Sequence, residues 1–192
     1  MWKWGVFLIV SAGIVYISRR SLRTWRSHGF FRFFAFEAIL GLILLNAGVW
    51  FHHPFSLLQI ASWSLLLGSL LLAIHGFILL RRMGKPDSRI NDSKRLGIEK
   101  TTRLVTTGAY RYIRHPLYAS LLFFGWGVFL KQPSLIGALL AVVTTVALYA
   151  TARVEERENV DNFGAEYIEY MQHTRMFWGH CRWSKLDSSP LM

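Results

Sequence analysis

Apolar residues gather in five stretches along the chain, and polar and charged residues fill the gaps between them. The stretches run from about Trp4 to Ile17, Phe33 to Phe51, Phe55 to Leu80, Leu117 to Leu130 and Leu135 to Ala152. A helix needs about 20 residues to cross the ~30 Å hydrocarbon core of a membrane. The pattern therefore predicts an all-α, polytopic integral membrane protein with about five transmembrane helices. The fourth stretch is short by this measure, so its helix either begins earlier, near Ile113, or crosses a locally thinned bilayer.

The connections between the stretches refine this picture. The first stretch resembles the apolar part of a signal peptide, but no convincing small-residue cleavage site follows it, so we expect a retained helix. Pro133 and Ser134 make the fourth connection short, which predicts a helical hairpin. We interpret the chain as a single domain: residues 1–80 hold the first three helices, 81–116 a cytoplasmic loop, 117–152 the hairpin and 153–192 a cytoplasmic C-terminal segment.

Composition and charge support a membrane protein. The chain is 53% hydrophobic and only 17% charged, which is too apolar for an ordinary soluble domain of 192 residues. Its net charge of +11 would suggest a nucleic-acid partner in a soluble protein. Here the Lys and Arg residues cluster between the apolar stretches, as in membrane proteins, so we expect no nucleic-acid partner.

The distribution of positive charge predicts an orientation. Residues 19–32, 81–115 and the tail from Arg153 are rich in Lys and Arg, whereas the connections at 52–54 and 131–133 are nearly uncharged. The positive-inside rule places the basic segments in the cytoplasm, with the N-terminus outside and the C-terminus inside. The single cysteine excludes an internal disulfide and a cysteine metal cluster.

The stretch GAYRYIRHPLYAS, residues 108–120, concentrates polar chemistry at the start of the fourth apolar stretch. Pro116 suits the first turn of a helix, where the free backbone N–H groups favour an anion. Arg114, His115 and Tyr118 share a helix face by their spacing. Tyr and Arg also gather at membrane boundaries without any function, so an interfacial belt is the alternative.

A second polar cluster, RVEERE, follows the fifth stretch and contains Glu155 and Glu156. The hairpin brings it next to the first cluster. The glutamates are either a solvated helix face neutralised by Arg153 and Arg157, or a site for a cationic cofactor. The following FGAEYIEY, residues 163–170, predicts a break at Gly164 and a short amphipathic helix on the membrane surface, either covering the core or acting as a lid.

Two ionisable residues lie inside predicted membrane helices. Glu37 and His75 are each about 8–9 Å below the cytoplasmic boundary, at 1.5 Å per residue. Such groups are usually paired or functional, so we expect them to face each other or the substrate cleft, unless they reach the interface. On the outer loop, His52 and His53 have no third ligand nearby, so we expect no metal site there.

Three motifs follow one another over about residues 102–177: LVTTGAYRYIRHPLY, the glutamate pair and FGAEYIEY. In their order and spacing this part of the chain resembles the isoprenylcysteine carboxyl methyltransferase and phospholipid methyltransferase group of integral-membrane enzymes. The resemblance implies S-adenosylmethionine, bound in a cytoplasm-facing pocket closed by the C-terminal segment, and a lipid-like acceptor that enters from the bilayer. It implies cofactor contacts at Thr102, Arg103, Leu104, Val105, Tyr110, His115, Pro116, Leu117, Tyr118 and Glu155. As catalytic residues we expect Arg114, Arg153 and Glu156.

The resemblance favours isoprenylcysteine-type carboxyl O-methylation, with N-methylation of a phospholipid or another small molecule as the alternative. An ionised carboxylate needs no base, whereas an amine needs one, for which Glu156 or His115 is a candidate. In the prenylcysteine enzymes an arginine holds the substrate carboxylate at the position that is Thr151 here, and Arg153 is the nearest arginine. Asn159 stands where the family often has leucine, and we expect it not to affect the cofactor site.

Two other classes of protein remain as alternatives: a non-catalytic membrane scaffold and a small transporter. Transporter sites lie near the midplane, which disfavours the transporter. The sequence identifies neither the acceptor nor the oligomeric state.

Overall fold

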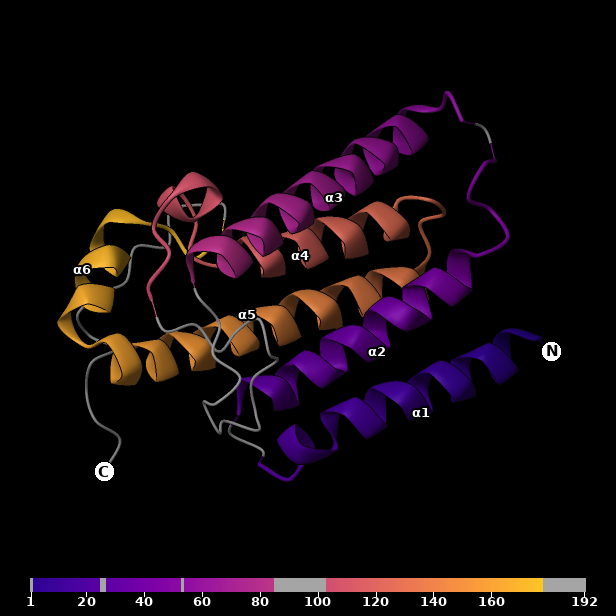
Figure 1. The fold of residues 1–192 in the computed structure, drawn as a ribbon. Coiled ribbons are helices and arrows are strands. Elements are labelled where there is room, and N and C mark those ends of the chain that lie inside the picture. Colours follow the sequence, from indigo (N-terminus) through magenta and orange to yellow (C-terminus); the bar gives the residue numbers. More distant parts are fainter. Residues whose placement is uncertain (1, 25–26, 53, 85–102, 178–192) are drawn as a thin grey trace.

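The structure is a computed structural model that describes residues 2–24, 27–52, 54–84 and 103–177 (Figure 1). These residues form α1 (Trp2–Leu22), α2 (His28–Asn46), α3 (Leu57–Met83), the 3-10 helix η2 (Gly108–Arg111), α4 (Pro116–Phe129), α5 (Leu135–Phe163) and α6 (Ala165–His173). The helices α1, α2, α3 and α5 are each long and apolar enough to cross a membrane, and α4 is shorter. The predicted all-α, polytopic membrane architecture is confirmed.

The helices lie side by side in the order α1, α2, α5, α4, α3 (Figure 1). The most buried apolar side chains lie where α2, α4 and α5 meet, and include Ala35, Leu42, Val128, Leu148 and Ala152. By contrast, only 6% of the apolar window of α1 and 11% of that of α3 are buried inside the protein. The two outer helices therefore present apolar surface suited to lipid.

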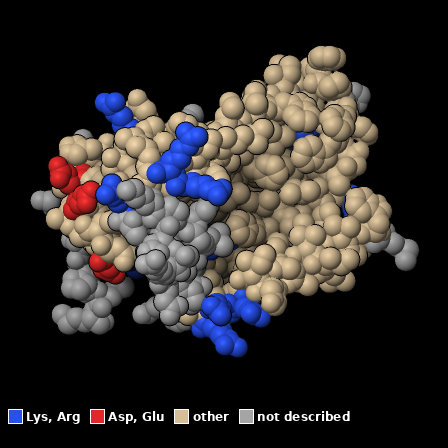
Figure 2. All heavy atoms as spheres, viewed as in Figure 1, with Lys and Arg blue, Asp and Glu red and all other residues tan. Residues whose placement is uncertain are grey.

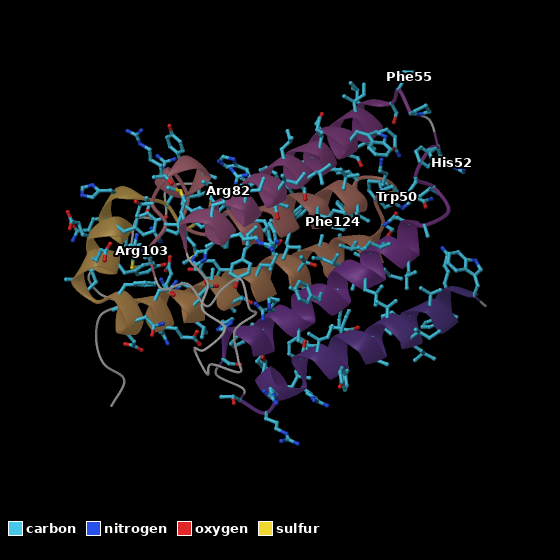
Figure 3. All side chains as sticks on the ribbon, in the orientation of Figure 1. Trp50, His52, Phe55, Arg82, Arg103 and Phe124 are labelled. Atoms are coloured by element: carbon cyan, nitrogen blue, oxygen red, sulfur yellow. The ribbon has the colours of Figure 1, made fainter. Side chains whose placement is uncertain are left out.

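The chemistry-bearing segments gather at one end of this bundle. Arg82 and Arg103 lie at that end, close to α6, whereas Trp50, His52 and Phe55 lie at the opposite end (Figure 3). On the face shown in Figure 2, most of the charged side chains lie towards the α6 end, and uncharged residues cover most of the remaining surface. This concentration of charged side chains at one end of the bundle agrees with the grouping of charge expected from the sequence.

Short polar residues set where several helices begin. The hydroxyls of Ser27, Ser56 and Ser134 accept the backbone N–H groups of Phe30, Gln59 and Gly137 at the starts of α2, α3 and α5. Such N-caps satisfy donors that lack a partner within the helix. Gly164, at φ 58°, separates α5 from α6, so the predicted break is confirmed. A positive φ is a conformation that glycine adopts with little strain.

The start of the fourth helix agrees with one expectation, and the end of the fifth helix differs. The fourth helix begins at Pro116, as its place in a first turn predicts, rather than near Ile113, so its 14 residues span only about 21 Å. The fifth helix does not stop at Ala152 but continues to Phe163, so its full length from Leu135 is 29 residues, about 43 Å. The glutamates of the second polar cluster therefore lie on the same rigid helix as the membrane span.

The far end of α4 is stabilised by α3. Ser62 Oγ donates to the carbonyl of Gly127 at 2.7 Å, and Gln59 Nε2 donates to the carbonyl of Lys131 at 2.9 Å. The Lys131 ammonium donates to Gln59 Oε1 at 3.1 Å and lies 3.5 Å from the centroid of the Trp63 ring. The last carbonyls of a helix have no partner within it, and here α3 side chains provide one. The short helix thus ends with these polar groups satisfied by protein rather than by water.

The expectation that Glu37 and His75 face each other was wrong. Ser11 Oγ of α1 donates to Glu37 Oε2 at 2.9 Å, whereas His75 Nε2 accepts the backbone N–H of Ala109 in η2 at 3.3 Å. The reason is the helix order, which places α5 and α4 between α2 and α3. Glu37 joins α2 to α1, and His75 supports the turn that precedes α4.

Candidate functional site

The two polar clusters meet at the cytoplasmic end predicted for the bundle. Arg114 Nε donates to Glu156 Oε1 at 2.5 Å, and the Tyr118 hydroxyl donates to a carboxylate oxygen of Glu155. Arg114 lies directly before α4, Tyr118 in its first turn, and both glutamates lie on the extension of α5. The hairpin geometry therefore brings the clusters together, as the sequence predicts.

A narrow pocket of about 80 Å³ opens between these groups and α6. Its walls are Leu80, Leu104, Val105, Tyr110, Arg114, His115, Leu117, Tyr118, Glu155, Asn159, Phe163, Tyr167 and Tyr170. Small-molecule sites are typically ~300 Å³ or larger. A ligand the size of a nucleoside therefore requires the walls to move apart.

His115 contributes a buried polar atom to this pocket. The residue is 5% exposed, and its ring stacks on that of Tyr118, with centroids 5.5 Å apart and planes 17° apart. Its Nε2 has no hydrogen-bond partner among the described residues and lies 3.6 Å from Glu156 Oε1, too far for a hydrogen bond. Buried polar atoms are nearly always bonded, so an unbonded polar atom in a residue that lines a pocket is a candidate contact for a polar ligand.

Aromatic side chains from two regions form another wall. The Tyr170 hydroxyl donates to the carbonyl of Tyr110 at 2.6 Å, and Tyr167 is only 2% exposed. Burial raises the pKa of Tyr167 and Tyr170 far above the ordinary value, so both phenols remain neutral. A neutral aromatic wall suits a flat, uncharged ring.

The Arg114 guanidinium is surrounded by protein. Its side chain is 1% exposed, and Nη1 donates to the carbonyls of Thr174 at 2.5 Å and Met171 at 3.3 Å, in addition to the ion pair with Glu156. Arg114 therefore connects the start of α4 with α5 and with the segment that follows α6.

The structure brings together most of the residues expected at the site. Those that line the pocket are Leu104, Val105, Tyr110, Arg114, His115, Leu117, Tyr118 and Glu155. Among the other described candidates, Arg103 is exposed, Pro116 forms the first turn of α4, Arg153 is half-buried on α5, and Glu156 lies behind the wall, bonded to Arg114. Thr102 lies outside the described residues.

Five lining residues were missed by sequence reasoning: Leu80, Asn159, Phe163, Tyr167 and Tyr170. The expectation that Asn159 has no part in the site was wrong, because it lies in the pocket wall. The signal was its spacing of four residues from Glu155, which places both on one face of α5. The spacing of Tyr167 and Tyr170 likewise marks the buried face of α6.

Thr151, the position that differs from the arginine of the prenylcysteine enzymes, is fully buried. Its hydroxyl donates to the carbonyl of Ala147 at 2.7 Å, within α5. This position therefore supplies no cation to the pocket.

Comparison with known proteins identifies the family of the chain. No solved structure matches the chain. A stretch of 74 residues is 32% identical to methanethiol S-methyltransferase 1 of Bradyrhizobium diazoefficiens; it covers 38% of this chain and 25% of that relative. The chain thus spans about a quarter of the length of that relative. Residues 58–166, more than half of the chain, match the phospholipid methyltransferase family and include the start of α4 and both glutamates. The chain therefore belongs to the phospholipid methyltransferase family.

Proposed function

We propose that the protein transfers a methyl group from S-adenosylmethionine to a lipid-like acceptor at the pocket between α4, α5 and α6. Family membership supports methyl transfer. The observation that carries the proposal is the buried Nε2 of His115, which lines the pocket without a hydrogen-bond partner among the described residues. A polar ligand at this position would satisfy it.

The lining residues fit this cofactor. When bound, S-adenosylmethionine supplies a methyl group on a sulfonium, which a nucleophile displaces in line. Tyr110, Phe163 and Tyr167 offer aromatic surface to its adenine. The Glu155 carboxylate suits the amine or the ribose hydroxyls, and the first turn of α4 suits the carboxylate. The residues thus bind and orient the reactants, which is the main contribution of a protein to such a displacement.

The first acceptor class that we propose is an isoprenylcysteine-type carboxylate, which requires no base. Arg153, half-buried two residues beyond Thr151, is then the nearest arginine on α5. The N-terminus would lie outside, with the site and the C-terminus in the cytoplasm.

A second candidate is an acceptor with a neutral nucleophile, an amine or a thiol. Two observations favour it: Thr151 supplies no positive charge, and the relative from Bradyrhizobium is named as a thiol methyltransferase. Such a nucleophile loses a proton on methylation, and the imidazole of His115, which lines the pocket with Nε2 3.6 Å from Glu156 Oε1, is the candidate acceptor of that proton.

The test is label transfer from methyl-labelled S-adenosylmethionine. The purified protein in lipid would receive, in separate reactions, a prenylcysteine analogue, an amine lipid extract and a small thiol. His115→Ala and Glu155→Ala are expected to lower kcat/KM by roughly 10- to 100-fold, the loss expected for a hydrogen bond to a charged group. His173→Ala and Glu169→Ala change exposed side chains of α6 outside the pocket and are the matched controls.

The product identifies the acceptor. An alkali-labile ester supports the carboxylate, and alkali-stable label in an amine or a thiol supports the second candidate. Absence of both label and cofactor binding would leave a non-catalytic membrane protein and contradict the proposal.

A further inference from the structure

The segment Thr174–Phe177, here called the strap, pairs with the residues just before α4. Arg114 N–H donates to the carbonyl of Arg175 at 2.7 Å, Arg175 N–H to that of Tyr112 at 3.2 Å, and His115 N–H to that of Met176 at 3.4 Å. The pairing is parallel, as in a very short ribbon. The strap therefore lies along residues 112–115, and its backbone bonds Arg114 and His115, which line the pocket.

The side chain of Arg114 fixes the strap to α5. Its Nε bonds the carboxylate of Glu156, and both hydrogens of Nη1 have acceptors in the carbonyls of Met171 and Thr174. Both members of the ion pair are almost fully buried, with side chains 1% and 4% exposed. One planar guanidinium thus joins three parts of the chain, a geometry that a lysine ammonium does not reproduce.

The same contacts determine the position of His115. Its backbone bonds the strap, and its ring lies between that of Tyr118 and that of Phe177, whose centroid is 6.1 Å away. Met176, also in the strap, is 4% exposed and packs in the same apolar cluster as Tyr118. If the strap is released, two of the contacts that orient the imidazole are lost.

We propose that Arg114 and Glu156 are a positioning pair rather than catalytic residues: they fasten the strap across the start of α4 and thereby hold His115 in the pocket. This inference rests on the proposed function, because it assigns His115 to the cofactor. Glu156 is absent from the pocket wall. Arg114 lines the pocket, but its side chain is only 1% exposed and directs three N–H groups at protein acceptors. The pair therefore acts on the reaction through the histidine beside it.

The experiment compares Arg114→Lys with the wild-type protein. We expect hydrogen exchange at the amides of Arg114, His115 and Arg175 to accelerate by roughly tenfold or more, since the strap loses a charge-assisted fork. The KM for S-adenosylmethionine should rise by roughly 10- to 100-fold, while kcat at saturating cofactor changes much less. Arg111→Lys is the matched control, because Arg111 is exposed in the same segment.

A second variant covers the case in which the single substitution prevents folding. A buried ion pair is often replaceable by apolar residues of similar volume. Arg114→Met with Glu156→Met should therefore keep the helices but show the same fast exchange at the three amides. Unchanged exchange in the folded variants would overturn the proposal. Fast exchange with an unchanged KM for S-adenosylmethionine would also overturn it, since the strap would then not hold His115 against the cofactor.

The two proposals fail in distinguishable ways. The exchange measurement needs no cofactor and tests the strap in the protein alone. If the wild-type protein does not bind S-adenosylmethionine, the proposed function fails, and with it the assigned purpose of the strap. If the wild-type protein binds the cofactor and the strap stays protected in Arg114→Lys, only the positioning role fails.

Discussion

At the scale of single residues, Tyr170 joins two motifs that are 60 positions apart in the chain. Its hydroxyl donates to the backbone of Tyr110, so the side chain fixes α6 against the turn before α4. Burial is the largest influence on its ionisation and raises the pKa. The Arg114 charge lowers it and the Glu156 charge raises it further. The phenol is therefore strongly held in its neutral form while α6 is docked.

This predicts a loss of stability in alkali that depends on Tyr170. A tyrosine released into water ionises near pH 10, whereas the docked one does not. The contribution of the neutral phenol is thus fully present below pH 10 and decreases as the pH rises above it. We expect the melting temperature of the wild-type protein to fall more steeply between pH 9 and about 11 than that of Tyr170→Phe, whose side chain does not ionise.

The Phe variant also loses a hydrogen bond at every pH, so the slope of melting temperature against pH is compared rather than its value. Parallel slopes for the two proteins would contradict the prediction. Tyr112→Phe is the control, since Tyr112 is 70% exposed.

The sequence was informative about some residues of the site and silent about others. His115, Tyr118 and Glu155 follow from the motifs that carry the family resemblance. The anchoring of Arg114 does not, because two of its acceptors are backbone carbonyls of Met171 and Thr174. Every residue has a carbonyl, so no pattern of side chains marks these two.

At the scale of elements, α4 depends on α3. Its 14 residues are too few to cross a bilayer alone, and Ser62 and Gln59 bond the carbonyls of Gly127 in its last turn and of Lys131 just beyond it. Unpaired backbone groups are costly in an apolar environment. A helix as short as α4 is therefore tolerated, because side chains of α3 donate hydrogen bonds to the carbonyls at its end.

This makes a prediction about two serines on α3. Ser62→Ala leaves the carbonyl of Gly127 buried without that donor, so we expect the free energy of unfolding in detergent to fall by about 1–3 kcal/mol. Ser64→Ala removes a hydroxyl that bonds only the carbonyl of Ile60 one turn back in the same helix, at an exposed position, and should change it by less than about 0.5 kcal/mol. Equal effects of the two substitutions on the unfolding free energy would show that the bond to α4 does not stabilise the bundle.

The elements themselves followed from the apolar stretches, but the end of α5 did not. Pro116 marked the start of α4 correctly, since proline is favoured in a first helical turn. The extension of α5 was missed because its residues from Arg153 onward are polar. A stretch identified by hydropathy ends at the first polar residues, even where the helix continues. Their helix is held instead by contacts with α2, α4 and α6.

At the scale of the whole molecule, the order of the helices decides which motifs meet. The consecutive helices α2 and α3 are not neighbours along most of their length, because α5 and α4 lie between them. For this reason the equal depth of Glu37 and His75 below the predicted membrane boundary did not identify their partners. The hairpin of α4 and α5 was a good guide, because a short connection restricts two helices to neighbouring positions.

The segments that carry the site lie at one end of the helix bundle. We predict that this end faces the cytoplasm. Positive loops are retained in the cytoplasm, so the connection after α2 should face outside and η2 inside. In a Cys181→Ser background, Phe51→Cys and Arg111→Cys place single thiols at exposed positions at opposite ends of the bundle. A membrane-impermeant maleimide should label the first in intact cells and the second only after lysis. The reverse pattern would place the pocket outside, where no S-adenosylmethionine is supplied by the cytoplasm, and would contradict both the orientation and the proposed function.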